Sequence, residues 1–218
     1  YLALPTSVNN VETFCCVSQI IDKGAGWFAE MGSRGSTGTK LLSISGDCTR
    51  PGVYELPFGI KVCDMLEKAG AENPYAVQIG GPSGQLIGSD DFCRTICYDD
   101  IATGGSVMIF SEERSPLMIA HEFMEFFCEE SCGYCTPCRA GNELLKERLE
   151  VIIRGEGTPE DLDYLQQLGE TVAFASRCGL GQTSPNPILT SLKNFRGEYE
   201  KLVKKNSDGM QPTFDIHK

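Results

Sequence analysis

Ser131-Cys132-Gly133-Tyr134-Cys135-Thr136-Pro137-Cys138-Arg139 places three thiols at the spacing C-x2-C-x2-C, and a fourth cysteine follows in Arg177-Cys178-Gly179-Leu180-Gly181. Three thiols at this spacing suit the corners of an iron–sulfur cube better than a single small ion, and the fourth would close the remaining corner. We therefore predict a [4Fe–4S] cluster that transfers single electrons. Its predicted ligands are Cys132, Cys135, Cys138 and Cys178.

Two other interpretations of these thiols stay open on the sequence alone. Structural zinc sites usually combine two pairs of closely spaced ligands, so three close cysteines with one distant cysteine are unusual for zinc. Cysteine is also one of the most frequently buried residue types, and the four side chains could pack in a core without any metal.

The pattern from Ser115 to Lys205 is helical throughout. Ser115 before Pro116 is typical of a helix start, and Thr158-Pro159-Glu160-Asp161 predicts another start with acidic residues at the positive end of the helix dipole. Ser184-Pro185 is expected to begin the last helix. Four amphipathic helices with short connections predict a four-helix bundle over residues 113–206.

The bundle gathers the predicted ligands at one end. Three cysteines lie at the entrance of its second helix, and Cys178 lies between the third and the fourth. Residues 207–218 are expected to form a polar tail.

A small α+β domain, β-grasp-like in its order of elements, is predicted over residues 38–112. The turn Arg50-Pro51-Gly52-Val53 has a type II signature, because proline presets φ and glycine accepts a positive φ. The expected elements are strands near Leu41–Ser45, Val53–Leu56, Ala76–Ile79 and Val107–Phe110, and a helix over Val62–Ala69.

A helix is expected to begin at Asn9 or Asn10, where Asn9 and Glu12 have the spacing of a capping box.

The stretch Gly24–Ala29 fits the letters of the dinucleotide fingerprint G-x-G-x-x-A, but neither a strand before it nor a βαβ unit around it is predicted. We interpret that fit as a chance match.

Composition narrows the range of partners and of locations. The net charge of −11 argues against nucleic acid and anionic membranes, because phosphate binding needs clustered lysine and arginine. We find no apolar run that predicts direct membrane insertion and no secretion signal. Eleven cysteines, an odd number in a chain of 218 residues, fit a reduced cytoplasmic setting better than a disulfide framework.

Four motifs of the sequence resemble one known family. They are Val8-Asn9-Asn10-Val11-Glu12-Thr13, Gly38-Thr39-Lys40, Arg50-Pro51-Gly52-Val53-Tyr54-Glu55 and Glu130–Arg139, in this order. The resemblance is to the NADH-binding flavoprotein (51 kDa-type) subunit of respiratory complex I and its soluble relatives, among them the diaphorase subunit of NAD-reducing hydrogenase and the β subunit of NAD-dependent formate dehydrogenase. Cys178–Pro187 is more similar to the soluble branch, and within it to the hydrogenase diaphorase.

The resemblance implies further cofactor contacts and a further domain. Val8, Asn9, Asn10 and Thr13 match positions that contact FMN in the family, although on the residues alone the two asparagines are more simply helix caps. The family also has an N-terminal flavin and NADH domain with a glycine-rich loop that is not found in this sequence. Residues 1–37 are therefore expected to be the end of that domain and a linker, and the chain alone is expected to be inactive with NADH.

These observations together predict the electron-transfer portion of an NAD(H):acceptor flavoprotein oxidoreductase. It would pass single electrons between FMN and the [4Fe–4S] cluster toward an iron–sulfur partner subunit. Two alternatives are kept: the complex I or formate dehydrogenase version of the same subunit, and a non-enzymatic docking module stabilised by a metal.

Overall fold

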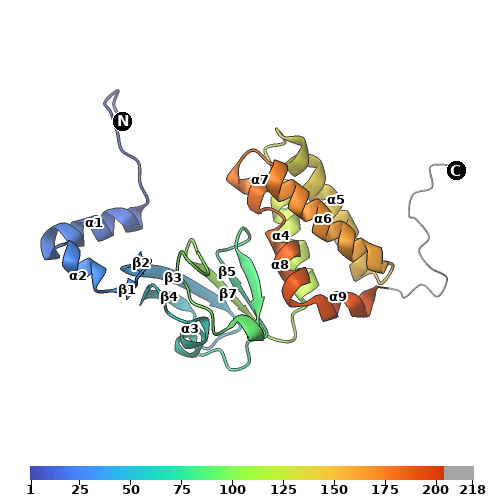
Figure 1. Cartoon of the computed structure of the whole chain (residues 1–218), viewed down its shortest axis with the longest axis horizontal. Coiled ribbons are helices and arrows are strands. Elements are labelled where there is room, and N and C mark those ends of the chain that lie inside the picture. The colour runs from blue at the N-terminus through green and yellow to red at the C-terminus, as the bar shows by residue number, and fades with distance from the viewer. Residues whose placement is uncertain (204–218) are drawn as a thin grey trace.

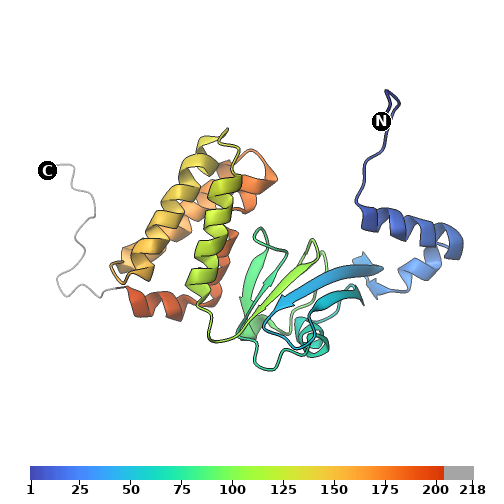
Figure 2. The same ribbon diagram turned by 180° about the vertical axis from the view of Figure 1, so that it is seen from behind.

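The computed structural model describes residues 1–203, which form one main β-sheet and a group of helices (Figure 1). An N-terminal arm with α1 (Val11–Lys23) and α2 (Ala25–Ala29) lies on one side of the sheet, and the helices that follow the sheet in the chain lie on the other. The view from behind gives the same order of arm, sheet and helices (Figure 2). A structure with both helices and a sheet is therefore confirmed, and the tail predicted over 207–218 lies outside the described residues.

The sheet has five strands in the order β4-β3-β7-β5-β6. Its central pair, β3 and β7, is parallel, and the other neighbouring strands are antiparallel. The strands are β3 (Thr39–Gly46), β4 (Gly52–Pro57), β5 (Ala76–Ile79), β6 (Gln85–Gly88) and β7 (Ser106–Phe110). A separate two-stranded ribbon, β1 (Gly32–Ser33) with β2 (Ser36–Thr37), joins the arm to the sheet.

Helix α3 (Val62–Ala69) covers one face of this sheet. Alternate strand residues point to that face, as the two-residue period of a β-strand requires. The apolar core between them contains Leu42, Ile44, Val77, Ile79, Val107 and Ile109 from the strands and Val62, Met65, Leu66 and Ala69 from the helix.

Two local predictions in this region were wrong or incomplete. Gly52 already belongs to β4 and pairs with Ile44, so the chain reverses before the expected type II turn. The arginine of that motif is bound by tertiary contacts, since Arg50 Nε donates to the Lys68 carbonyl at 2.9 Å at the end of α3. Strand β6 was not predicted, because its four residues follow a glycine-rich break too closely to show a period.

The helices that follow the sheet pack around a second apolar core, which includes Met124, Leu145, Leu165, Leu192 and Tyr199. The helices are α4 (Pro116–Glu130), α5 (Thr136–Ile153), α6 (Pro159–Ala175), α7 (Gly179–Thr183), α8 (Asn186–Asn194) and α9 (Arg196–Leu202).

The two predicted helix starts and the predicted last helix have different outcomes. The start at Thr158 is confirmed, since its backbone N–H donates to Asp161 Oδ2 at 2.8 Å in a capping box. Ser115 occupies the N-cap of α4 without a side-chain hydrogen bond to the helix. The predicted last helix is divided into α8 and α9 at Phe195, whose φ of −128° and ψ of 32° leave the helical region. Phe195 is buried against the sheet, with its ring centroid 5.4 Å from that of Tyr75, so tertiary packing accompanies the break.

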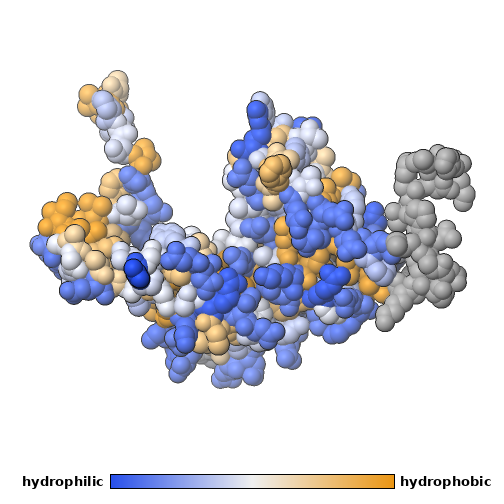
Figure 3. All heavy atoms as spheres, in the orientation of Figure 1, coloured by the Kyte–Doolittle hydropathy of each residue, from blue (hydrophilic) through white to orange (hydrophobic). Residues whose placement is uncertain are grey.

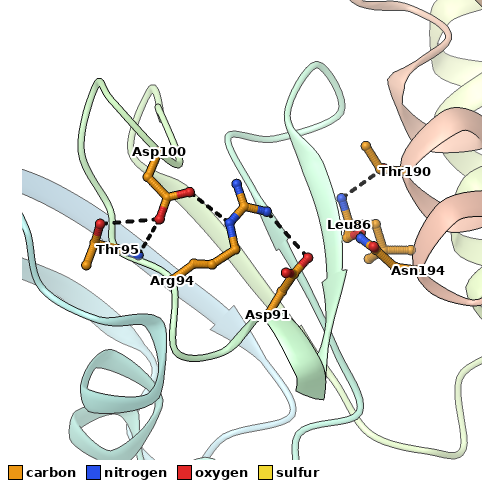
Figure 4. Close-up of polar contacts among 7 residues, drawn as sticks. All are labelled: Leu86, Asp91, Arg94, Thr95, Asp100, Thr190 and Asn194. Atoms are coloured by element: carbon orange, nitrogen blue, oxygen red, sulfur yellow. Dashed lines mark hydrogen bonds and ion pairs between the residues drawn. The ribbon is translucent and has the colours of Figure 1, made fainter.

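Helix α8 covers the free edge of β6 and joins the sheet to the helices. Thr190 Oγ1 accepts a hydrogen bond from the backbone N–H of Leu86 at 3.0 Å, and Asn194 Nδ2 donates to the Leu86 carbonyl at 2.8 Å (Figure 4). Side chains of one turn of α8 therefore satisfy the backbone groups of Leu86, which would otherwise be unpaired at the sheet edge.

The same view shows Arg94 between Asp91 and Asp100 in the loop after β6. Arg94 Nε donates to Asp100 Oδ1 at 2.8 Å and fixes this loop.

Asn194→Ala should lower the free energy of unfolding by about 1–2 kcal/mol, because the buried Leu86 carbonyl loses its donor. Chemical denaturation followed by circular dichroism measures this loss. Lys193→Ala is the matched control, since Lys193 is the exposed neighbour on the same helix. Equal stability of the two variants would contradict the proposed role of Asn194.

Candidate metal centre

The three close cysteines lie where α4 ends and α5 begins. Cys132 and Cys135 are in the connection between these helices, and Cys138 is in the first turn of α5. Gly133 has a φ of +73°, a left-handed conformation that glycine adopts readily. Arg139 fixes this bend, because its guanidinium donates to the Gly133 carbonyl at 2.6 Å.

The segment that carries Cys178 lies against this connection. Cys178 is the N-cap of α7, forty residues after Cys138. The guanidinium of Arg177 lies 5.2 Å from the ring centroid of Tyr134, between Cys132 and Cys135. The backbone N–H of Arg177 is also the main reason why the pKa of the Cys135 thiol is lowered. The fold thus brings the two predicted ligand segments together.

The four thiols differ in exposure, and all are free in the structure. Cys138 is buried, Cys135 is half-buried, and Cys132 and Cys178 are exposed. Within residues 1–203, no three histidine, cysteine or acidic side chains are close enough to hold one metal ion. A zinc site would need thiolates within roughly 3.8 Å of each other, given zinc–sulfur bonds of about 2.3 Å in a tetrahedron. A [4Fe–4S] cluster takes each thiolate on a different iron, so the arrangement gives no support to the zinc alternative.

The polar groups around the thiols suit a cluster rich in sulfur. Cys138 Sγ lies 3.3 Å from Ser131 Oγ and accepts a hydrogen bond from Asn142 Nδ2 at 3.4 Å. The hydroxyl of Ser176 is buried and has no hydrogen-bond partner among the described residues. A Cβ on Gly181 would lie 2.7 Å from that hydroxyl and 3.1 Å from Cys138 Cβ, so this position requires the smallest residue. Donors that face sulfur stabilise the thiolate form, which is the form that binds iron.

A fifth thiol near the site has the opposite environment. The pKa of Cys128, in the last turn of α4, is raised to about 12, first by burial and then by the charge of Glu143. At neutral pH Cys128 therefore stays a neutral thiol. The contrast with Cys135 agrees with the motif, which does not include Cys128 among the predicted ligands.

Cys128 should stay unmodified by iodoacetamide at pH 8 in the folded protein without iron, because the thiolate is the reactive form. Cys93, which is exposed, should react under the same conditions and is the control within the same chain. Mass spectrometry of the digested protein measures both sites. Modification of Cys128 as fast as of Cys93 would contradict the assignment.

The residues predicted to contact FMN lie elsewhere. Val8, Asn9, Asn10 and Thr13 are all exposed, just before α1 and in its first turn, and the two ribbon views place α1 and α7 on opposite sides of the sheet (Figures 1 and 2). The expected capping box is wrong in its residues. The N-cap is Asn10, whose Oδ1 accepts from the Glu12 backbone N–H at 2.8 Å.

Glu12 has a role that the sequence did not predict. Its carboxylate accepts a hydrogen bond from the Leu41 backbone N–H at 2.7 Å and forms an ion pair with Lys40, so it attaches α1 to β3. Burial raises the pKa of Glu12, but the Leu41 N–H and Lys40 outweigh burial and the pKa is lowered from its ordinary value of 4.5. No local pattern indicates this contact, because the partners are 28 and 29 residues away.

A carboxylate with a lowered pKa stabilises the structure above its ordinary pKa, and this contribution is lost as the pH falls through the lowered value. Acidification below about pH 4.5 should therefore loosen α1 from the sheet. Trp27, the single tryptophan, lines a cavity of about 520 Å³ together with Glu12, so its fluorescence reports the change. Glu12→Gln, which keeps the shape but cannot ionise, should lack this acid step. An identical acid step in the variant would contradict the assignment.

Comparison with known proteins finds a family match in the helical region. Residues 118–202 match the model of the family described as the NADH-ubiquinone oxidoreductase-F iron-sulfur binding region, which is of the 4Fe–4S type. The predicted resemblance and the predicted iron–sulfur cofactor are therefore confirmed at the level of this region.

Relatives at the level of the whole chain come from two kinds of oxidoreductase. The chain is 46% identical over 217 residues to the NAD-reducing hydrogenase HoxS subunit alpha of Cupriavidus necator, covering 99% of this chain and 36% of that subunit. It is 39% identical to the NADP-reducing hydrogenase subunit HndC of Solidesulfovibrio fructosivorans, covering 93% of this chain and 44% of that subunit. The corresponding NADH-quinone oxidoreductase subunit of Escherichia coli is 33% identical, with coverage of 92% and 48%. The chain thus spans about a third to a half of the length of these relatives.

The fold matches that of a solved structure described as an NAD+-reducing [NiFe]-hydrogenase in the H2-reduced state. The TM-score is 0.88 at 38% sequence identity, and the match covers 95% of this chain and 37% of the hydrogenase chain. A search of residues 1–203 for a helix that could cross a lipid bilayer found none of sufficient length and apolarity.

Proposed function

We propose that this chain is the electron-transfer portion of an NAD(H)-linked flavoprotein oxidoreductase of the hydrogenase diaphorase type. Cys132, Cys135, Cys138 and Cys178 would hold a [4Fe–4S] cluster, which when bound accepts and releases one electron at a time. The observation that carries this proposal is the contact of Arg177 with Tyr134 and Cys135, because it brings the segment of the fourth cysteine against the segment of the other three.

The protein's own part in this function is to hold and surround the thiolates. Backbone N–H groups and the Asn142 amide donate toward sulfur, and burial keeps solvent away from Cys138. Hydrogen-bond donors held in place around sulfur keep the thiolates ionised and set how strongly their negative charge is stabilised.

The finer architecture is also part of the proposal. We infer a β-grasp-like unit over 38–112, supported by the mixed sheet with a parallel central pair and by α3 packed on one face. We infer a helical iron–sulfur unit over 113–206, in which α4, α5, α6 and α8 form the four-helix bundle. Residues 1–37 would be the end of a flavin and NADH domain.

The FMN contacts are assigned by resemblance to Val8, Asn9, Asn10 and Thr13. Their exposure and the apolar surface of α1 support this assignment. Val11 and Ile21 are 75% and 80% exposed, and hydrophobic residues gather on the N-terminal arm in Figure 3. A helix with this much exposed apolar surface is expected to be covered by further protein. In this proposal, the flavin-binding part of the complete subunit covers it, and the partner that receives electrons is an iron–sulfur subunit.

Cys178→Ser should lower the iron and labile sulfide content of the anaerobically purified protein, because one corner of the cluster loses its thiolate. The broad visible absorption that bleaches on reduction should weaken with it. Cys93→Ser, an exposed thiol outside the motif, should leave both unchanged.

Wild-type protein that contains no iron or labile sulfide would contradict the cluster assignment and favour the alternative of a non-enzymatic docking module. A cluster that survives Cys178→Ser in full would leave the cofactor in place but remove Cys178 as a ligand. Iron and sulfide analysis together with electron paramagnetic resonance of the reduced protein separates these outcomes.

A further inference from the structure

Two polar side chains, which are hydrogen-bonded to each other, are buried behind the cysteine site. Asn142 of α5 is 1% exposed, and Ser184, just after α7, is 0% exposed. Ser184 Oγ donates to Asn142 Oδ1 at 2.7 Å, and Asn142 Nδ2 donates to Cys138 Sγ at 3.4 Å. Buried amides and hydroxyls are costly unless they are hydrogen-bonded, so each group holds the next in place.

The direction of the Asn142 amide follows from the chemistry of its two neighbours. Ser184 can satisfy either orientation of the amide, because its hydroxyl has a second acceptor in the Gly181 carbonyl at 3.1 Å. Cys138 as a thiolate can only accept. The amide therefore presents its N–H to sulfur whenever Cys138 is ionised, and the carbonyl oxygen takes the Ser184 hydroxyl.

We propose that Asn142, whose amide oxygen is anchored by the Ser184 hydroxyl, is a positioning residue that raises the reduction potential of the site. This inference rests on the proposed function. Reduction adds one electron and so increases the negative charge on the sulfur atoms, and an N–H directed at sulfur stabilises the reduced state more than the oxidised state.

The burial of Cys138 makes this donor hard to replace. Its exposed fraction is 5%, so water cannot easily substitute for a lost N–H. Cys132 and Cys178 are exposed, and solvent can serve as donor to them. The potential is therefore expected to respond more to Asn142 than to side chains near the exposed ligands.

The experiment uses the whole natural polypeptide that contains this sequence, purified without oxygen, with three variants. Asn142→Leu removes the N–H at similar volume, and Ser184→Ala removes the hydroxyl that anchors the amide oxygen. Ser191→Ala is the control, because Ser191 is an equally buried serine that contacts Tyr199 at 2.6 Å and not the cysteine segments. Iron and sulfide content is measured first, and a redox titration followed by electron paramagnetic resonance then gives the midpoint potential.

Asn142→Leu should shift the reduction equilibrium about tenfold toward the oxidised form, a fall in midpoint of about 59 mV for one electron. Ser184→Ala should shift the midpoint in the same direction by less, and Ser191→Ala should not shift it. In pulsed resonance spectra of the reduced site, Asn142→Leu should also lose a proton coupling that exchanges in deuterated water.

The outcomes separate this inference from the proposed function. Wild-type protein without iron and sulfide would overturn the proposed function itself. Protein that holds the cluster, but whose midpoint in Asn142→Leu equals that of Ser191→Ala, would overturn only the role of Asn142. If Asn142→Leu fails to take up iron, Ser184→Ala decides, and an unchanged midpoint in that variant overturns the inference.

Discussion

The proposed function depends on one contact, that between the α4–α5 connection and the segment after α6. Four thiols can serve one site only if two pieces of chain forty residues apart stay in contact. Helix packing maintains this contact. Gly141 of α5 lies so close to α6 that a Cβ would come within 2.3 Å of Val172 Cγ2. Because packed helix interiors deform little, the close approach of α5 and α6 fixes the distance between the two segments.

Two further attachments extend this rigidity across the molecule. Thr190 and Asn194 of α8 bind both backbone groups of Leu86, so the helices that carry the cysteines are joined to the edge of the sheet. At the other side Glu12 joins α1 to β3. The segment proposed to contact FMN and the segments proposed to hold the cluster are thus connected through one sheet, which suits a protein that must keep two redox groups at a fixed separation.

Much of this architecture could be predicted from local patterns, and the failures have a common cause. Helix α6 carries its own start signal at Thr158, and α3 shows an apolar period from Val62, so both could be placed without knowledge of the fold. The break at Phe195 and the sheet contact of Glu12 depend on partners distant in sequence, and no local rule contains them. Asn142 offered a weak signal, a polar residue on the buried face of a helix. Its partner Ser184 becomes visible only when the helices are packed.

The thiols of this chain show how the fold, more than the composition, decides their chemistry. The protein is strongly acidic overall, with a net charge of −11, which by itself opposes the formation of further anions. The pKa of Cys128 follows that tendency, because burial and Glu143 raise it to about 12. The pKa of Cys135 is lowered instead, because the backbone N–H of Arg177 donates to its sulfur. Two cysteines seven residues apart therefore have pKa values shifted in opposite directions, Cys128 mainly by burial and Cys135 mainly by a backbone donor, which suits the first to packing and the second to the proposed site.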